Sequence, residues 1–550
     1  MTQKPVYKAP ADFRVLFVYP NIQMSALAPQ GIGYLSAMLK REGFQCDLFD
    51  STFYTSDISS DTNEEKVHLS IVRPFSWKER GIEPKTSDMA GDFRKMVDDY
   101  QPDLIAVSVV ENTWYIAKYL LDALHVDVPT IVGGVFSTYA TDIVLSHPKV
   151  DYACRGDGEV PLLELCQAMA GGNDTTTIAG IWAKDDRGIH KNPIGQGIAM
   201  DDLPFPDWSI FDEQSLYRPM QGRVYKTMGV ETQRGCPYKC TFCNSPSNIT
   251  LYRAESAGSF YRKKSVKRIH EELDFMRQTY GPEFIYFVVD TFLAMGDKEL
   301  EEFSDMYQDF KIPFWMNTRA ETVNEWRADH LERMNCLRMN IGIEHGNEEY
   351  RRKVLQRPVT NKKMLESFQA CSGRSFVTVA NSIVGLPDET RELAFDTIKL
   401  NRSLPDDIDA SGAFIFTPFH GTPLRERAVA AGYVDPDTIC SLNVTKGSIL
   451  DMPQFPVEDI QGLTRVFSFY VKMPESEWPF IREAEQMNEA GEKRFGELRE
   501  VFNRDYRRSL SNPKDVSSFD LVVGENEWDK VDSKDSKPKL DPHAFSDLHG

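Results

Sequence analysis

The fold is decided by the stretch Arg234-Gly235-Cys236-Pro237-Tyr238-Lys239-Cys240-Thr241-Phe242-Cys243-Asn244, which sets three cysteines in a CxxxCxxC spacing. Structural zinc takes four protein ligands, and no second Cys or His pair lies nearby. A cubane iron–sulfur cluster also takes four thiolates as a rule, so three on one short loop indicate a 4Fe-4S cluster with one iron open to a small molecule. Incidental cysteines are the other reading, disfavoured because three of the nine fall in one eight-residue window.

The bulk composition is that of a soluble globular protein. The 550 residues are 41% hydrophobic and 27% charged, and a chain this long is expected to form three or four units. No apolar run reaches the ~20 residues of a membrane span, and the first ten residues lack the apolar region of a secretory signal. The cysteines do not show the even spacings of a disulfide framework, which predicts that the protein lies in the reducing cytoplasm. A net charge of −20 argues against a large nucleic-acid footprint.

Short apolar runs separated by helical segments predict a doubly wound, Rossmann-like α/β domain over residues 1–168. Continuously apolar runs are typical of buried parallel strands. The polar stretch 51–87 shows no clear period and is expected to be an insertion or a long loop. The predicted strands are residues 14–19, 46–50, 104–109 and 130–134, and residues 152–159 are predicted as a fifth strand running into a turn.

Small and polar residues stand at the ends of these strands and at the start of the first helix. Ligands of open α/β sheets bind at the carboxyl edge, where the loops diverge and bare backbone can approach a cofactor. A purely structural turn role is the alternative for each glycine. The candidates are Gly31, Gly33, Ser108, Gly133, Gly134, Gly156 and Gly158.

Residues 169–225 are rich in Gly, Asp and Pro and predict a linker with a short hairpin around 180–188. From 226 to 432, strands alternate with helices, which predicts an open (β/α)6 partial TIM barrel, wide enough for a large substrate. Its first strand is expected to end at Thr232. The others are expected at 284–290, 314–319, 338–344, 377–385 and 412–417.

Polar residues end several of these strands, where barrel chemistry is found. Asp290, Arg319, Glu344 and Asn381 are such residues, and an internal salt bridge or cap is the alternative role for each. Lone histidines are more often structural than catalytic, so neither His345 nor His420 is proposed as a base.

A helical, aromatic region is predicted over residues 433–510, with its aromatic residues packing across the open side of the barrel. Contact with substrate is the alternative role for those aromatic side chains. Residues 511–550 are rich in Asp, Lys and Ser and are expected to be disordered.

Several motifs resemble the radical SAM superfamily, in the form that carries an N-terminal cobalamin-binding domain. The cysteine spacing with Phe242 resembles the cluster signature. Over roughly residues 12–168, GIGYL, GG and RGDGE resemble the cobalamin-binding domain, although its Asp-x-His-x-x-Gly motif is missing after Tyr19-Pro20-Asn21. The words VVDTFLA, NTRAE, GIEHGNE, IVGLPDET and FTPFHGTPL resemble successive strand motifs of the core, so the resemblance reaches about residue 485.

This resemblance implies three cofactors and a residue set for each. The 4Fe-4S cluster would be held by Cys236, Cys240 and Cys243. Cobalamin would bind beside the glycines and Ser108 of the first sheet. S-adenosylmethionine would bind beside Phe242, Asp290, Arg319, Gly342, Glu344 and Asn381.

The resemblance also implies an enzyme that uses a deoxyadenosyl radical to activate an inert carbon, with methyl transfer from methylcobalamin as the leading outcome. A cyclase or rearranging enzyme of the anaerobic tetrapyrrole-cyclase type is the second reading, and a non-catalytic iron–sulfur or cobalamin sensor is the third. The expected partners are a small-molecule, lipid or tetrapyrrole-like substrate and an electron donor such as flavodoxin or ferredoxin. The motifs leave the substrate itself open.

Overall fold

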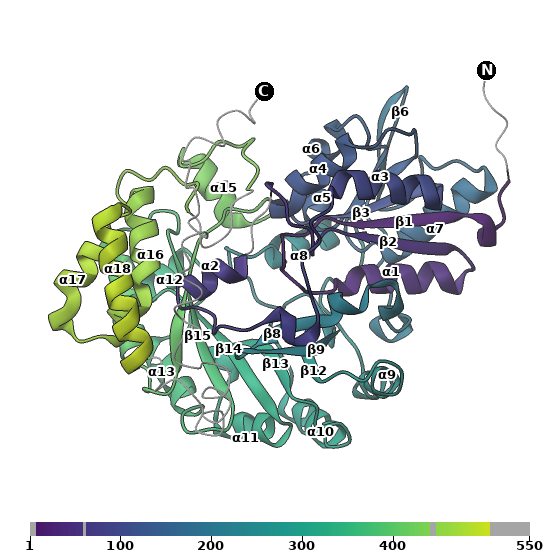
Figure 1. The fold of residues 1–550 in the computed structure, drawn as a ribbon. Coiled ribbons are helices and arrows are strands. Elements are labelled where there is room, and N and C mark those ends of the chain that lie inside the picture. Colours follow the sequence, from purple (N-terminus) through teal and green to yellow (C-terminus); the bar gives the residue numbers. More distant parts are fainter. Residues whose placement is uncertain (1–6, 59–61, 441–446, 507–550) are drawn as a thin grey trace. The chain divides into compact units, whose positions relative to one another are not determined.

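The computed structural model describes residues 7–58, 62–440 and 447–506. Two mainly parallel sheets follow one another along the chain, and helices complete the C-terminal part (Figure 1). The prediction for residues 511–550 lies outside the described residues.

The first sheet has the strand order β2-β1-β3-β4-β5-β6-β7. Its first five strands are parallel, in the 2-1-3-4-5 order of flavodoxin-like doubly wound folds, which confirms the predicted class. The five strands are β1 Arg14–Tyr19, β2 Gln45–Asp50, β3 Leu104–Ser108, β4 Thr130–Gly133 and β5 Tyr152–Cys154.

Alternate residues of β1 enter two different hydrophobic clusters, because successive side chains of a strand point to opposite faces. Val15 and Phe17 pack with residues of α1 and α7. Leu16 and Val18 pack with residues of α3 and α4. Both faces of the sheet are therefore covered by helices. Their bounds are α1 Gln30–Arg41, α3 Met89–Tyr100, α4 Trp114–Asp122 and α7 Glu159–Gly171.

The hairpin predicted around residues 180–188 is present and extends the first sheet. Strand β6 (Ile181–Asp185) pairs antiparallel with β5, and β7 (Gly188–Lys191) pairs with β6. Part of the predicted linker, 169–225, is therefore hydrogen-bonded into the preceding sheet.

The stretch 51–87 leaves the first sheet and contacts the C-terminal helices. It contains α2 (Thr62–His68) and a short 3-10 helix, Trp77–Arg80. The ring of His68 lies 2.8 Å from a guanidinium nitrogen of Arg499, and Ser70 donates a 3.2 Å hydrogen bond to the Asn503 side chain. The insertion predicted here thus connects two regions that are distant in sequence.

The second sheet has the order β16-β15-β14-β13-β12-β9-β8, in which six parallel strands are followed by one antiparallel edge strand. This is the predicted (β/α)6 partial barrel. Figure 1 shows its strands side by side, with α10, α11 and α13 along one side. The strands are β8 Tyr217–Met220, β9 Arg223–Val230, β12 Phe284–Phe287, β13 Phe314–Arg319, β14 Cys336–Glu344, β15 Val377–Val384 and β16 Asp409–Ile415. The main helices are α9 Val266–Thr279, α10 Asp297–Tyr307, α11 Glu325–Arg333, α13 Asn361–Gln369 and α14 Arg391–Arg402.

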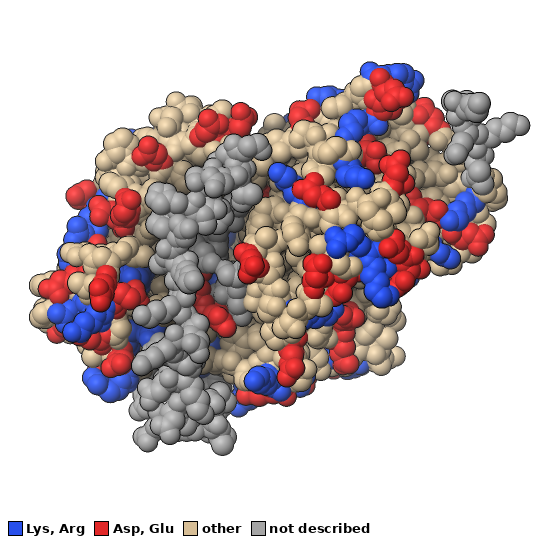
Figure 2. Space-filling view, turned by 45° about the horizontal axis from the view of Figure 1, so that its top comes forward, with Lys and Arg blue, Asp and Glu red and all other residues tan. Residues whose placement is uncertain are grey.

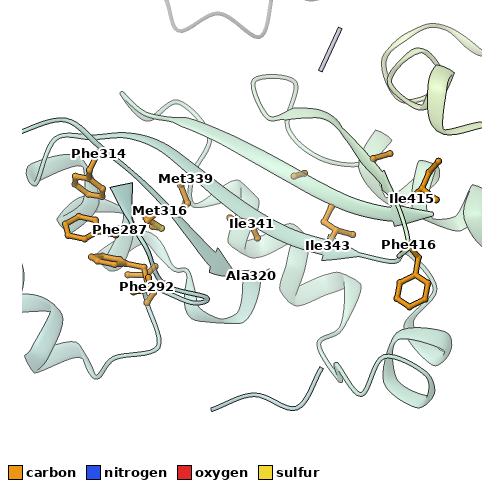
Figure 3. Close-up of a cluster of buried hydrophobic side chains, with 14 of the residues drawn as sticks. Phe287, Phe292, Phe314, Met316, Ala320, Met339, Ile341, Ile343, Ile415 and Phe416 are labelled. Carbon is orange, nitrogen blue, oxygen red and sulfur yellow. The ribbon is translucent and has the colours of Figure 1, made fainter. Parts of the chain in front are cut away.

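The two faces of this sheet differ in chemistry. Met316, Met339 and Ile341 are fully buried in the apolar layer shown in Figure 3. The intervening residues, such as Asn317 and Asn340, are polar and only half-buried. The alternation of apolar and polar residues leaves a polar inner face inside the partial barrel.

Helices α16 (Val457–Lys472), α17 (Trp478–Ala484) and α18 (Glu489–Val501) confirm the predicted helical region. Helix α16 packs on edge strand β16. Phe469 is fully buried and stacks on Phe495, whereas Phe480 is 43% exposed, so only part of the aromatic set has a core role.

The surface carries both signs of charge. On the face drawn in Figure 2, acidic and basic side chains are interspersed, with no continuous basic stripe. None of the helices in the described part of the chain combines the length and the apolar character needed to cross a membrane.

Candidate active site

The cysteine loop follows the carboxyl ends of β9 and of β10 (Gln233–Arg234). Gly235 turns the chain into the loop with a φ of +80°, and a Cβ there would lie 2.7 Å from the Phe260 ring, so a glycine is needed on both counts. Cys236 and Cys240 are 7% exposed, and Cys243 is half-buried. Three thiols are thus presented on a short irregular segment at the rim of the barrel.

Each thiol has a polar neighbour, which for Cys236 and Cys240 comes from another part of the rim. Thr291 Oγ1 lies 3.5 Å from the Cys236 sulfur, the Ser245 N–H donates to Cys243 at 3.4 Å, and Arg319 donates to Cys240 at 2.7 Å. Burial, followed by the nearby charge of Asp290, raises the pKa of the Cys243 thiol to about 11. Bound metal reverses such a shift, because a coordinating thiol is deprotonated outright.

The donor set distinguishes a cluster from a single ion. Within the described ranges, no three His, Cys, Asp or Glu side chains come together to hold one metal ion. The three thiolates of a cubane bind three different irons and need not converge on one point. The chemistry of this loop therefore suits an iron–sulfur cluster better than zinc.

A chain of alternating charges leads from the cysteine loop to the end of β14. Arg319 lies 3.9 Å from the Tyr238 ring centroid and donates to Glu321 at 2.7 Å. Arg357 donates to Glu344 at 3.0 Å and lies 3.9 Å from Glu321. Burial raises the pKa of the Glu321 carboxyl, but the positive charges of Arg357 and Arg319 outweigh it, and the net pKa is lowered.

Glu344 ends β14 in a strained conformation. Its φ is +63°, a left-handed value that costs a non-glycine residue about 1–3 kcal/mol and is concentrated at functional sites. The carboxylate folds back over Gly342, where a Cβ would overlap it, and Arg357 also donates to the Gly342 carbonyl at 2.7 Å. Burial raises the pKa of Glu344, and Arg357 opposes that rise. The site therefore combines bare backbone with a constrained carboxylate.

The remaining predicted rim residues lie nearby. Asn381 is the register neighbour of Gly342 on one side and of Gly412 on the other. A Cβ on Gly412 would lie 2.8 Å from the Asn381 Oδ1. Asp290 follows β12 and its side chain is exposed, yet desolvation by the surrounding protein, followed by the charge of Glu231, raises its pKa. Phe242 is partly buried against the main hydrophobic cluster.

Both histidines near the rim have structural partners. His345 is fully buried, 3.2 Å from Glu389, with its ring stacked on Tyr350. His420 lies 2.9 Å from the Glu111 carboxylate.

At the first sheet, four of the predicted residues meet at the carboxyl edge. Ser108 and Gly133 are register neighbours. Gly134 has a φ of +106° and approaches Val109 so closely that no Cβ would fit. The Gly156 N–H donates to Thr138 at 3.1 Å. At the carboxyl ends of these three adjacent strands, small residues allow a ligand to come close to the backbone.

The other three predicted glycines lie around α1 and α7. A Cβ on Gly33 would lie 3.1 Å from the Cβ of Pro206, so the glycine lets these two segments pack closely. Gly31 is exposed, with open space around its Cβ position. Gly158 precedes α7 beside Leu35.

The carboxyl edge of the first sheet contacts the rim of the second. Tyr139 donates a 2.7 Å hydrogen bond to Asn248, which lies five residues beyond Cys243. Burial and then the charge of the Cys243 thiolate raise the pKa of the Tyr139 phenol. The two predicted cofactor regions therefore adjoin each other.

Sequence reasoning did not find Glu321, Arg357, Tyr139 or Glu111. Glu321 could have been found, because it stands two residues after Arg319 in the quoted motif NTRAE. The other three come to the site through tertiary contacts and carry no local signal.

Residues 230–400 match the Radical SAM superfamily. The matched segment begins at the end of β9 and contains the cysteine loop and the rim of the barrel. Residues 230–400 therefore form a radical SAM domain.

Three comparisons refine this class. An uncharacterized methyltransferase of Pyrococcus horikoshii, PH0819, is 27% identical over 399 residues, covering 69% of this chain and 81% of the relative. The anaerobic magnesium-protoporphyrin IX monomethyl ester cyclase of Rubrivivax gelatinosus is 25% identical over 422 residues, covering 74% and 68%. The solved structure of OxsB, a cobalamin-dependent S-adenosylmethionine radical enzyme with aqua-cobalamin and S-adenosylmethionine bound, matches with a TM-score of 0.60 and 14% identity, covering 90% and 72%. The chain thus has the fold of a cobalamin-dependent radical SAM protein.

Proposed function

We propose that this protein is a cobalamin-dependent radical SAM methyltransferase that acts on an unactivated carbon. The observation that carries the proposal is the contact between the carboxyl edge of the first sheet, through Tyr139, and the segment that follows the cysteine loop. A methyl donor on that edge would be next to the site of radical formation.

Cys236, Cys240 and Cys243 would hold the 4Fe-4S cluster. When bound and reduced, such a cluster supplies the electron that splits S-adenosylmethionine into methionine and a deoxyadenosyl radical, which then removes hydrogen from the substrate. The chain's own task is to position the reactants and exclude water, because the cofactors carry the chemistry.

S-Adenosylmethionine would bind across the rim formed by Phe242, Asp290, Arg319, Gly342, Glu344 and Asn381. Bare backbone at Gly342 allows close approach, and Arg357 holds the Glu344 carboxylate ready to accept hydrogen bonds. Arg319, next to Cys240, provides a positive charge beside the cluster loop.

Cobalamin would bind along the carboxyl edge of the first sheet, beside Gly31, Gly33, Ser108, Gly133, Gly134, Gly156 and Gly158. Val110, which follows β3, is 46% exposed and gives this edge an apolar surface. The polar inner face of the barrel would receive a small-molecule, lipid or tetrapyrrole-like substrate. A flavodoxin or ferredoxin would supply electrons in the reducing cytoplasm.

The test is anaerobic turnover with candidate substrates and quantification of products by mass spectrometry. Methyl transfer consumes two molecules of S-adenosylmethionine, one cleaved by reduction and one that supplies the methyl group through cobalamin. Deoxyadenosine and S-adenosylhomocysteine should therefore appear in about a one-to-one ratio with methylated product.

The second candidate function is a cyclase or rearranging enzyme, which the likeness to the Rubrivivax gelatinosus cyclase favours. Such an enzyme would form deoxyadenosine, or recycle it, with almost no S-adenosylhomocysteine. Product-linked deoxyadenosine without S-adenosylhomocysteine would therefore replace the methyltransferase proposal with the cyclase. Deoxyadenosine formation of either kind would exclude a non-catalytic sensor.

A further inference from the structure

A cavity of about 240 Å³ lies at the end of the barrel opposite the cysteine loop. Trp315, Arg338 and Asp409 line it from the amino ends of β13, β14 and β16, whereas the cysteine loop follows the carboxyl end of β9. One water molecule needs about 10–15 Å³ of cavity volume. This cavity therefore has room for a ligand group. Its other walls are the loop after β1, the 51–87 insertion, the β8 turn and Phe502.

The lining of this cavity is basic in an otherwise acidic protein. Among the described residues that form it, four are basic, Lys66, Arg73, Arg218 and Arg338, and one is acidic, Asp409. The whole chain has a net charge of −20. A concave basic surface with low-dielectric walls focuses its field on anions.

Three buried hydrogen-bond donors in the cavity wall have no partner in the structure. They are Arg218 Nη1, Gln221 Nε2 and Trp315 Nε1. A buried donor left without an acceptor is costly, and native structures seldom keep one without a reason. The oxygens of an oxyanion are acceptors of the kind that these donors lack.

The Arg218 guanidinium is fixed in place by two aromatic rings. Tyr286 and Trp315 are stacked, with ring centroids 4.2 Å apart. Arg218 lies 5.2 and 4.8 Å from these centroids. A planar guanidinium held in this way is pre-organised for bidentate binding of carboxylate or phosphate.

Polar side chains on the inner face of the barrel are hydrogen-bonded to one another next to the cavity. Arg338 donates to Asn340 at 3.1 Å, Asn340 to Asn317 at 3.3 Å, and Asn317 to Tyr286 at 3.4 Å. Along β14, Gly342 lies four residues beyond Arg338, about 13 Å, since a parallel strand rises ~3.3 Å per residue.

We infer that the cavity binds an oxyanion group at the far end of an elongated substrate. The substrate class is thus a molecule whose carboxylate, phosphate or phosphonate contacts Arg218 and Arg338 while its reacting carbon extends about 13 Å to the rim. This inference rests on the proposed function, because it assigns that enzyme's substrate a charged end.

The test measures binding of small probes to the full-length protein by isothermal titration calorimetry. Phenyl phosphate and phenylacetate supply an oxyanion on an aromatic body, and benzyl alcohol is the neutral probe. At least one anion should bind tenfold or more tightly than benzyl alcohol. Tighter binding of phenyl phosphate would assign the phosphate or phosphonate class, and tighter binding of phenylacetate the carboxylate class.

Variants locate the binding. Arg218→Gln and Arg338→Gln should each weaken anion binding about tenfold or more. Trp315→Phe keeps the stacked ring and removes only one donor, so a few-fold loss is expected. Arg187→Gln, on the exposed turn between β6 and β7, is the matched control and should bind as the wild type does.

Anion binding no tighter than that of benzyl alcohol, or unchanged in both arginine variants, would overturn the inference. If the arginine variants fail to fold, Trp315→Phe and competition by inorganic phosphate on the wild-type protein still decide it, since phosphate displaces the probe only from an oxyanion site. None of these measurements uses the cluster or S-adenosylmethionine. Failure here therefore leaves the proposed methyl transfer standing, and an enzyme that binds the probes but never methylates would refute the methyl transfer alone.

Discussion

Glu111 and His420 join the two sheets at their carboxyl ends. Glu111 follows β3 of the first sheet, and its carboxylate accepts a 2.7 Å hydrogen bond from the His420 N–H while lying 2.9 Å from that residue's Nδ1. The Cys440 N–H donates to the same carboxylate at 2.8 Å. Glu111 is only 3% exposed, so its three contacts with the segment beyond β16 are buried.

Replacing Glu111 by Gln should destabilise the protein in a pH-dependent way. Burial raises the pKa of the Glu111 carboxyl, but the hydrogen bonds from His420 and Cys440 outweigh it and lower the net pKa below its ordinary value of 4.5. The unfolded chain therefore binds more protons as the pH falls, so the charge stabilises the fold above about pH 4.5 and this contribution is lost below it. We expect a loss of about 1–3 kcal/mol in the free energy of unfolding at pH 7, measured by denaturant titration.

The matched control is Glu283→Gln, since Glu283 forms an exposed pair with Arg80 and should cost less than about 1 kcal/mol. A stability gap for Glu111→Gln that stayed constant from pH 7 to well below pH 4.5 would contradict the assigned ionisation.

Replacing any one of Cys236, Cys240 or Cys243 by Ala should remove most of the cubane iron and all reductive cleavage of S-adenosylmethionine. Three thiolates are the whole protein ligand set proposed for the cluster. Iron analysis and deoxyadenosine formation measure the effect. Cys46→Ala, on β2 and outside the loop, should keep both; a triple variant that kept both would refute the assignment.

Bound cobalamin should have no protein imidazole as its lower axial ligand. The loop from Pro20 to Pro29 contains no histidine, and the Asn21 side chain already donates to the Ser25 carbonyl and to Thr52. Electron paramagnetic resonance of the Co(II) state should therefore show no hyperfine splitting from a protein nitrogen. Clear splitting would mean that the ligand comes from another segment, and a protein that bound no cobalamin would need another role for its first domain.

Replacing Gly342 by Ala should raise the KM for S-adenosylmethionine about tenfold or more, with little change in iron content. The new Cβ would overlap the Glu344 carboxylate and push it out of the rim. Steady-state cleavage of S-adenosylmethionine measures this. Gly296→Ala is the control, because Gly296 has a φ of −71° and open space at its Cβ position. Equal KM values for the two variants would remove Gly342 and Glu344 from the proposed site.

The strands could be predicted because each is marked by its own residues. The strand predicted at 314–319 is observed at the same bounds, since its residues alternate between buried and half-buried from Phe314 to Asn317. The stretch 152–159, predicted as a strand running into a turn, is a strand only as far as Cys154, and Gly156 then turns the chain with a φ of +72°. Local sequence patterns thus predict which strands exist better than they predict the residue at which each strand ends.

Features built from distant segments could not be predicted in this way. Strand β8 contains Arg218 and Pro219, which do not mark it as a strand, yet it pairs with β9 at the sheet edge. Arg357 reaches the rim only because β14 and the segment after α12 (Glu348–Lys353) fold together. The basic cavity likewise draws on seven separate stretches of the described chain that share no pattern.

The contact between His68 and Arg499 bridges 431 positions of sequence. It cannot form until the ribosome has made the chain as far as α18, because its second partner lies there. Both sheets are complete well before that point, so a nascent or truncated chain ending before α18 would have its full set of strands and still lack this connection. The order of synthesis therefore makes this contact and the hydrogen bond from Ser70 to Asn503 the last of the long-range contacts described here that can form.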